Sequence, residues 1–327
     1  MKYRKLGKTD VSVSEISLGC WQLGGKWGDP YDDELAFKTL KTATELDITC
    51  FDTADVYQGG MSENAIGRYI KTLKEKPFVI TKAGRKSNPH IAEAYNEETL
   101  RKYVDDSREN MDVDALDMVL LHCPPTDVYY MPEVFKLMDT LKEEGKIKHY
   151  GVSVERVEEG LKAMEYEGVE AIEIIFNMFR LRPAELFFEQ AKLHNVGVIV
   201  RVPLASGLLS GKFSKDTTFK KDDHRNFNRN GEAFDKGETF SGVDFETGLK
   251  AVDELKSLFP DKSLPQLALR YILMFDAVST VIPGASKTEH VKSNVQAVDL
   301  DPLTDEEMAK IKSVYNKYIK EPVHYMW

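Results

Sequence analysis

Short runs of hydrophobic residues alternate along the chain with longer segments whose hydrophobic residues recur at helical spacing. In the segment Glu97–Met111, Leu100, Val104 and Met111 fall near one face, and charged residues occupy the opposite face. Strands that alternate with such helices indicate parallel β-α units. The eight predicted strands are Ile16–Leu18, Ile48–Phe51, Phe78–Ile80, Met118–Leu121, Lys148–Val152, Ala171–Ile175, Val196–Val200 and Val278–Ile282. The other predicted helices include Asp33–Leu46, Ser62–Leu73, Pro132–Glu144, Glu155–Glu167, Pro183–His194 and Lys287–Val298.

Eight β-α units predict an α/β fold of the (β/α)8 TIM barrel type. An open doubly wound sheet is the alternative, because periodicity does not show whether the sheet closes. The first dozen residues break at Gly7–Asp10 and predict an N-terminal β-hairpin. The segment Asp305–Ile319 predicts an extra C-terminal helix, and the tail Glu321–Trp327 either lines a pocket or simply packs. No change of composition marks a linker, so we expect residues 1–327 to form a single domain.

One irregular stretch, Phe213–Phe245, is polar and rich in Asn, Asp and Gly. It follows the seventh predicted strand. Its length is typical of a functional lid or clamp, because long irregular loops are uncommon in compact domains.

The composition narrows the class of protein. The chain of 327 residues is 42% hydrophobic, which is enough for a full core and excludes disorder. A formal net charge of −10 argues against nucleic acid and anionic membranes as partners. No run approaches the roughly 18 apolar residues of a membrane span, and the N-terminus lacks the apolar core of a signal peptide. Cys20, Cys50 and Cys123 show no CxxC spacing, so we expect a reducing, cytoplasmic location.

Titratable residues follow three neighbouring predicted strands, at the end where a TIM barrel carries its active site. Asp52 ends the second strand, and Tyr57 lies in the loop after it. Lys82 ends the third strand and His122 ends the fourth. Each has an ordinary structural explanation, such as a turn cap, a solvated strand end or a hydrogen-bonded core histidine. Their convergence at one end favours an active site.

These residue types suit the reduction of a carbonyl group. A tyrosine titrates near about pH 10 unaided, and an adjacent ammonium group is expected to lower the pKa of Tyr57. Asp52 would hold Lys82 charged and in place. A neutral His122 would donate a hydrogen bond to the carbonyl oxygen, and a cofactor would supply the hydride.

The sequence resembles the aldo-keto reductase superfamily. Phe51–Tyr57, Ile80–Lys82 and Leu120–His122 match its Asp–Tyr–Lys–His tetrad motifs in order. The resemblance covers nearly the whole chain, from Leu18–Trp21 to Val281–Ser286. It implies the (β/α)8 barrel and the NAD(P)H-dependent reduction of an aldehyde, ketone or sugar-like carbonyl to an alcohol.

The resemblance also implies roles for the four residues. Tyr57 would be the general acid, Lys82 and Asp52 its tuning pair, and His122 the donor that orients the substrate. Trp21 and Trp27, together with Tyr57 and His122, would line the substrate pocket, although ordinary packing explains the tryptophans equally well.

Two loops with small residues are candidates for binding phosphate groups. No GxGxxG follows the first strand, so the fingerprint of open dinucleotide-binding sheets is absent. Pro203–Lys212 follows the seventh strand, and Gly284–Lys287 follows the eighth and opens a helix. Loops in these positions are the usual phosphate site of such barrels. A turn that serves only geometry is the alternative for each loop.

By the family resemblance, both loops match segments that bind NAD(P)H. Ser286 and Lys287 could hold a 2′-phosphate, so NADPH is favoured and NADH remains possible. His290 and Ser293 depart from the family pattern and weaken this preference. Arg225 or Arg229 could close over the pyrophosphate, but a solvated surface charge is as good an interpretation. The expected cofactor-binding residues are Gly19, Cys20, Trp21, Asp52, Ser153, Glu173, Arg201, Pro203, Leu204, Gly207, Ser210, Lys212, Arg225, Gly284, Ser286, Lys287, His290 and Asn294.

Three residues depart from the family near the nicotinamide. Val154 stands where many relatives have Asn, Glu173 where Gln is usual, and Arg201 where an aromatic residue stacks on the ring. We expect Glu173 and Arg201 to pair, with the guanidinium plane replacing the aromatic stack. A cation there would repel the oxidised ring more than the reduced one.

Two other classes of function remain as alternatives. One is a cofactor-binding regulatory module with little turnover, as in relatives that serve as ion-channel accessory subunits, and the intact tetrad speaks against it. The other is a metal-dependent hydrolase, but the seven histidines show no metal-ligand spacing, so no metal site is expected. The physiological substrate and the oligomeric state are not fixed by the sequence.

Overall fold

The computed structural model of the protein describes residues 1–26 and 29–327. Within them, eight parallel strands form one sheet in the order β10-β9-β8-β7-β6-β5-β4-β3. The two outer strands also meet: the Ser17 N–H donates to the Val281 carbonyl at 2.8 Å, and the Val281 N–H donates to the Glu15 carbonyl at 2.9 Å. The sheet is therefore a closed barrel. Its strands are β3 (Leu18–Gly19), β4 (Cys50–Asp52), β5 (Phe78–Ala83), β6 (Leu116–His122), β7 (Ile147–Ser153), β8 (Ala171–Ile175), β9 (Gly197–Arg201) and β10 (Val278–Val281).

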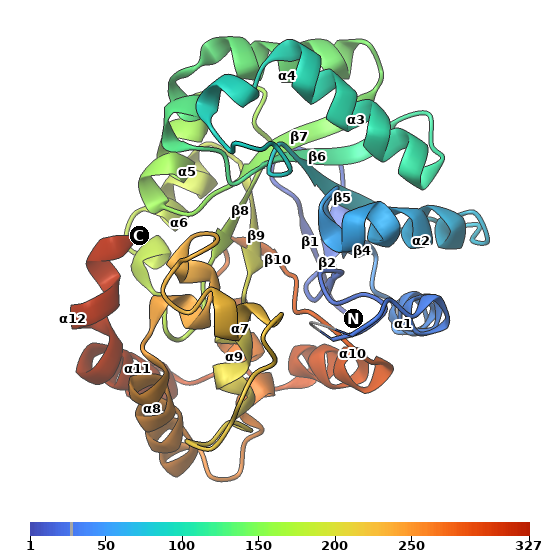
Figure 1. Ribbon diagram of the computed structural model, residues 1–327. Helices are drawn as coiled ribbons and strands as arrows, with labels where there is room; N and C mark the ends of the chain where they lie inside the picture. Colours follow the sequence, from blue (N-terminus) through green and yellow to red (C-terminus); the bar gives the residue numbers. More distant parts are fainter. Residues whose placement is uncertain (27–28) are drawn as a thin grey trace.

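Helices surround the barrel on the outside, so the strands are buried on both faces (Figure 1). Side chains fix several helix starts: Asp32 accepts a hydrogen bond from the Leu35 N–H, and Asn96 accepts one from the Thr99 N–H. The helices are α1 (Asp33–Glu45), α2 (Met61–Ile70), α3 (Glu97–Met111), α4 (Pro132–Glu143), α5 (Val157–Ala163), α6 (Phe187–Leu193), α7 (His224–Phe227), α8 (Phe245–Leu258), α9 (Leu264–Leu273), α10 (Thr288–Val295), α11 (Asp305–Val314) and α12 (Lys320–Val323).

The predicted (β/α)8 barrel is confirmed, and its closure excludes the open sheet. All eight predicted strands are present. The first is shorter than expected, because Ile16 meets Val281 through an isolated bridge and the continuous strand begins at Leu18. The extra C-terminal helix is also present, as α11 with a π-helical turn over Tyr315–Ile319.

The predicted N-terminal hairpin consists of β1 (Tyr3–Lys5) and β2 (Ser12–Ser14). Leu6 and Val13 are completely buried and pack against the hydrophobic side chains inside the barrel. Gly7 lies in the left-handed region with φ +55°, and a Cβ there would sit 2.2 Å from the Gly197 backbone nitrogen. The hairpin therefore plugs the end of the barrel where the strands begin.

We call residues 213–245 the strap. It leaves the barrel after β9 and crosses the opening at the carboxyl ends of the strands, where α7 lies (Figure 1). The C-terminal Trp327 is buried against it, and its Nε1 donates to Asp235 Oδ1 at 2.8 Å. The ring also packs on the Arg180 guanidinium, whose carbon lies 4.2 Å from the ring centroid. Of the two interpretations of the tail, packing is therefore the correct one for Trp327.

We expect Leu6→Ala to lower the free energy of unfolding by about 2–5 kcal/mol, because it leaves a cavity in the plugged end of the barrel. Urea unfolding followed by circular dichroism measures this change. Leu193→Ala, at a leucine that is 71% exposed, is the matched control and should shift the midpoint little. Equal shifts for the two variants would contradict the role assigned to the hairpin.

Candidate active site

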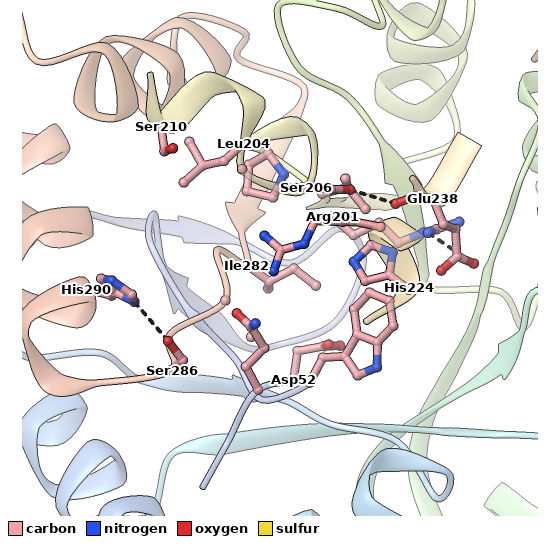
Figure 2. A pocket seen from close by; sticks show the side chains of 18 of the residues that line it. Asp52, Arg201, Leu204, Ser206, Ser210, His224, Glu238, Ile282, Ser286 and His290 are labelled. Atoms are coloured by element: carbon pink, nitrogen blue, oxygen red, sulfur yellow. Dashed lines mark hydrogen bonds and ion pairs between the residues drawn. The ribbon is translucent and has the colours of Figure 1, made fainter. Parts of the chain in front are cut away.

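A cavity of about 800 Å³ opens at the carboxyl ends of the strands (Figure 2). Its volume lies in the range of small-molecule and cofactor sites. The strands and the loops after them line its floor, and the strap contributes side chains such as His224 and Glu238. The predicted residues that line it are Gly19, Trp21, Asp52, Tyr57, His122, Glu173, Arg201, Pro203, Leu204, Gly207, Ser210, Lys212, Arg225, Gly284, Ser286, His290 and Asn294.

Several of the predicted residues do not line the cavity, Lys82 beneath its floor among them. Cys20 and Ser153 are completely buried, and neither is among the described lining residues. Lys287 is exposed at the start of α10 and does not line the cavity either. Trp27 lies outside the described residues. Arg229 is exposed and packs on Phe245, with its guanidinium carbon 5.3 Å from the ring centroid.

The ammonium group of Lys82 is the centre of the predicted tetrad. It is completely buried and donates to both carboxylate oxygens of Asp52, at 2.6 and 2.7 Å. It also donates to the Thr53 carbonyl at 3.0 Å. The nitrogen lies 5.3 Å from the centroid of the Tyr57 ring. The structure thus brings Asp52, Lys82 and Tyr57 together, because β4 and β5 are adjacent and parallel.

The expected lowering of the Tyr57 pKa is wrong in its net direction. Burial raises the pKa of Tyr57 above its usual value, and Lys82 only partly opposes this effect. The Asp52 and Glu173 carboxylates raise it further. A buried phenolate is costly even beside an ammonium group, because the nearby carboxylates offset that charge. The Tyr57 phenol therefore keeps its proton, which is the state that a proton donor needs.

His122 lies on the other side of Tyr57. The two ring centroids are 6.1 Å apart with an interplanar angle of 81°. Burial, with the charges of Arg85 and Lys82, lowers the pKa of His122 well below its usual value, so the ring is neutral as expected. Its Nδ1 is buried without a hydrogen-bond partner among the described residues.

Glu173 and Arg201 pair as expected, but both belong to a larger network. Arg201 Nε lies 3.8 Å from Glu173 Oε1, and Lys82 Nζ lies 3.3 Å from Glu173 Oε2. Arg201 also contacts Glu155 at 3.0 Å and, in the strap, Glu238 at 3.6 Å. The charges therefore run without a break from the tetrad to the strap.

The loop after β9 departs from ordinary backbone geometry. Val202, Ala205 and Ser206 have positive φ values of 51°, 47° and 53°, which non-glycine residues rarely adopt. At Gly207, with φ +99°, a Cβ would sit 2.8 Å from the Phe213 ring. Ser206 ties this loop to the strap, since its Oγ donates to the Glu238 carbonyl at 2.8 Å (Figure 2).

The residues of the cavity fit a nicotinamide dinucleotide. The basic side chains Lys26, Lys212 and Arg225 line it and suit phosphate groups. Near the tetrad, Arg201 Nε and Glu173 Oε2 are buried and form no hydrogen bond with described residues. Both atoms are sealed off from the cavity and face charged partners, Arg201 Nε with Glu173 Oε1 at 3.8 Å and Glu173 Oε2 with Lys82 Nζ at 3.3 Å, so they belong to the ion-pair network.

Sequence reasoning missed several residues that line the cavity. Arg85 lies two residues after β5, so the strand-end rule could have found it. Glu155, two residues after β7, is not a lining residue but belongs to the ion-pair network beside the cavity. Glu238, His224 and Phe234 come from the irregular strap, where no sequence pattern marks which side chains face the barrel.

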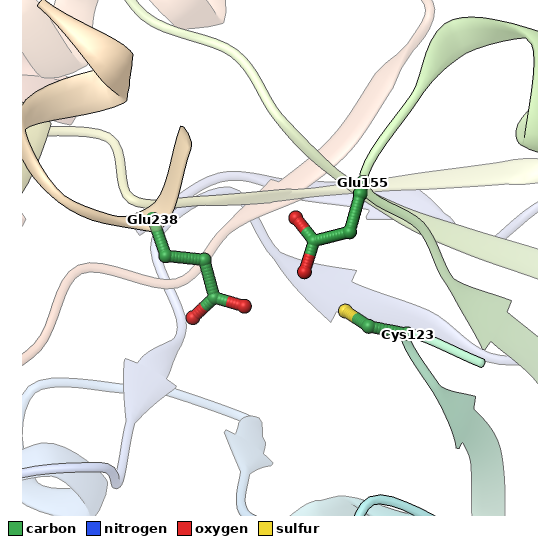
Figure 3. A group of neighbouring side chains, drawn as sticks. All are labelled: Cys123, Glu155 and Glu238. Atoms are coloured by element: carbon green, nitrogen blue, oxygen red, sulfur yellow. The ribbon is translucent and has the colours of Figure 1, made fainter. Parts of the chain in front are cut away.

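Among the described residues, Cys123, Glu155 and Glu238 form one cluster whose ligand atoms could hold a metal ion (Figure 3). Guanidinium groups already neutralise both carboxylates, since Arg85 Nη1 lies 3.0 Å from Glu238 and Arg201 Nη2 lies 3.0 Å from Glu155. A second cation would meet strong repulsion there. The arrangement is therefore an ion-pair network between the barrel and the strap.

The fold and this site define a barrel with a dinucleotide-sized cavity and a Tyr–Lys–Asp–His constellation. The model of the aldo/keto reductase family matches residues 15–316. The chain therefore belongs to this family. The match supports an oxidoreductase of the carbonyl-reducing type with a nicotinamide cofactor, and it does not choose between NADPH and NADH.

Individual relatives agree with the family. The uncharacterized oxidoreductase YqkF of Bacillus subtilis is 30% identical, with 96% of each chain covered. The NADH-specific methylglyoxal reductase of Escherichia coli is 25% identical, over 92% of this chain and 94% of the relative. A putative voltage-gated potassium channel subunit beta of Schizosaccharomyces pombe is 30% identical, over 96% and 93%. The holo form of aldo-keto reductase AKR11C1 from Bacillus halodurans superimposes with a TM-score of 0.77 at 29% identity, covering 96% of each chain.

The helices were also compared with what a membrane span requires. Over residues 1–26 and 29–327, none of the helices combines the length and the apolar character that crossing a membrane requires.

Asp55, in the loop between Asp52 and Tyr57, yields a prediction about pH. Both its carboxylate oxygens are buried without hydrogen bonds to described residues, and Lys86 Nζ lies 3.5 Å away. Burial raises the pKa of Asp55 to about 7. Because the folded state holds this proton more tightly than the unfolded state, its contribution to stability is lost as pH rises from about 4 through 7.

We expect Asp55→Asn to remove this loss. Between pH 5 and pH 8, the wild type should lose about 2–4 kcal/mol of unfolding free energy relative to the variant. Urea unfolding at the two pH values measures the difference. Asp127→Asn, at an exposed position, is the control. Parallel pH profiles of wild type and Asp55→Asn would show that Asp55 is ionised in the folded protein at both values.

Proposed function

We propose that the protein is an NADPH-dependent reductase that converts an aldehyde, ketone or sugar-like carbonyl to an alcohol. The observation that carries this proposal is the convergence of Tyr57, His122 and the Lys82–Asp52 pair at one end of a dinucleotide-sized cavity. The family match supports the reaction type. We propose that its partner is a small carbonyl compound. We also propose that the protein is a single domain, is cytoplasmic and binds neither nucleic acid nor a membrane.

The residues divide the work of the reaction. When bound, the reduced nicotinamide supplies the hydride. Tyr57 is the general acid, and its raised pKa keeps the phenol protonated until negative charge develops on the substrate oxygen. The Lys82 ammonium, held by Asp52, stabilises the phenolate that remains. Neutral His122 donates a hydrogen bond to the same oxygen and orients it.

The cofactor residues are those that the family resemblance implies, and most of them line the cavity. Leu204, Gly207, Ser210 and Lys212 would cradle the pyrophosphate, with Arg225 of the strap beside them. Around the adenosine ribose we place Ser286, His290 and Asn294, which line the same cavity. Lys287, at the rim, would add charge for a 2′-phosphate, so NADPH is preferred and NADH remains possible.

A regulatory module that binds the cofactor with little turnover is the second candidate, and the similarity to a putative channel subunit beta favours it. It predicts tight cofactor binding without carbonyl reduction. The assay of the following paragraph separates the two candidates.

We expect Tyr57→Phe to lower kcat for carbonyl reduction by about 10²–10⁴-fold, because the proton donor is lost, while cofactor affinity changes little. The loss of absorbance of NADPH and of NADH, followed across a panel of aldehydes, ketones and keto-sugars, measures turnover. Tyr130→Phe, at a tyrosine that is 66% exposed, is the control. Unchanged turnover in Tyr57→Phe would show that another group donates the proton.

We also propose that Arg201 replaces the aromatic stack on the nicotinamide and disfavours the positively charged oxidised ring. Glu155, Glu173 and Glu238 surround its guanidinium and reduce the effect. Arg201→Tyr should therefore shift the ratio of Kd values for oxidised and reduced cofactor by on the order of 1 kcal/mol, about fivefold, toward the oxidised form. Fluorescence titration with both forms measures the ratio, and an unchanged ratio would dispose of the idea.

A further inference from the structure

Arg85 lines the same end of the cavity as the proposed proton donor. It lies three residues after Lys82 and shares the cavity with Tyr57 and His122. Among the charges that lower the pKa of His122, that of Arg85 has the largest effect, and both side chains line the cavity. The catalytic roles assigned above leave Arg85 without a function.

The polar contacts described for Arg85 use one nitrogen of its guanidinium, Nη1. Nη1 donates to Glu155 Oε1 at 3.5 Å and lies 3.0 Å from Glu238 Oε1. Within residues 1–26 and 29–327, Nε and Nη2 donate to no acceptor, and they are not among the atoms sealed off from solvent. These N–H groups belong to a rigid fork that matches the two oxygens of a carboxylate.

Arg85 shares its carboxylate partners with a second cation, Arg201. Lys82 is matched by Asp52 and Glu173, at 2.6 and 3.3 Å. Arg85 and Arg201 share the two remaining carboxylates of the network, Glu155 and Glu238. Burial raises the pKa of Glu238 to about 7, so near neutral pH it carries only part of a negative charge. The network as a whole carries no excess of positive charge, so an anion here would be held by the exposed N–H groups of Arg85 itself.

A row of aromatic rings connects the proton donor to Arg85. The Tyr57 and Trp21 ring centroids are 6.1 Å apart, and those of Trp21 and Phe234 are 6.4 Å apart. The Arg85 guanidinium carbon lies 5.5 Å from the Phe234 centroid. The wall between the two polar ends is thus apolar, and it suits an apolar or aromatic spacer.

We propose that the substrate is an oxo acid, whose carbonyl oxygen meets Tyr57 and His122 while its carboxylate is held by the free N–H groups of Arg85. An apolar spacer separates the two groups and lies along Trp21 and Phe234. This inference rests on the proposed carbonyl reduction and names its substrate class.

The test compares substrates of equal shape and different charge. The purified full chain is assayed with 3- and 4-carboxybenzaldehyde and with the corresponding uncharged carboxamides, and the acid-to-amide ratio of kcat/KM is recorded for each pair. We expect the wild type to prefer at least one acid. Arg85→Met should lower that ratio by about ten- to a hundredfold, the effect of losing hydrogen bonds to a charged group. Arg85→Lys should restore part of it.

Two further variants separate recognition from a purely structural role of Arg85. Glu238→Gln also breaks the contact between Arg85 and the strap, but it removes a negative charge, so the acid-to-amide ratio should rise. Lys86→Met deletes the neighbouring cation, which contacts Asp55 and Asp106 and does not line the cavity, so the ratio should stay unchanged. If Arg85→Met and Glu238→Gln lowered turnover of acid and amide alike, Arg85 would only hold the strap, and the proposal would be overturned.

A binding measurement keeps this inference distinct from the proposed reaction. Calorimetric titration of the chain with 4-carboxybenzaldehyde, and with its amide, reports recognition without turnover. Failure to reduce any aldehyde would overturn carbonyl reduction, even if the acid still bound through Arg85. Reduction of amides and acids with equal efficiency would overturn the substrate class and leave the reductase activity in place.

Discussion

The buried ammonium group of Lys82 is the charge on which the rest of the site depends. A cation at this depth costs several kcal/mol unless it is paired, and here two carboxylates, from Asp52 and Glu173, lie within 3.3 Å of it. The same three charges set the state of Tyr57: the ammonium group favours the phenolate, while the carboxylates and burial favour the phenol. The fold needs this ion pairing to tolerate the lysine, and the proposed chemistry uses the protonated tyrosine that results.

The strap extends this electrostatic arrangement beyond the barrel. Glu238 brings a carboxylate from the strap to Arg85 and Arg201, and the Ser206 hydroxyl fastens the loop after β9 to the Glu238 backbone. The C-terminal residue Trp327 donates a hydrogen bond to Asp235 of the strap. The strap therefore forms one wall of the cavity, and it is anchored from the barrel and from the C-terminal tail alike.

The two halves of the cavity differ in the kind of groups that line them. In one half, the loops after β9 and β10 provide backbone turns and basic side chains, which suit the binding of phosphate groups. The half around Tyr57 contains a chain of buried charges that alternate in sign from Asp52 to Glu238. Arg201 stands where the two halves meet, and it contacts Glu173 beside the tetrad as well as Glu238 in the strap.

The sequence by itself determined the eight β-α units and the order of Asp52, Tyr57, Lys82 and His122 at the ends of successive strands. Closure of the sheet was decided by the tertiary structure, because it depends on the contact of Ser17 and Glu15 with Val281, far apart in the chain. The sequence also indicated the correct direction of the Lys82 effect on Tyr57. Only the tertiary structure decided whether the pKa of Tyr57 rises or falls overall. Its burial, and the approach of the Glu173 carboxylate, depend on residues far apart in the chain. For the same reason the strap could be recognised as a loop, whereas the contact of Glu238 with Arg85 depends on how two distant segments pack.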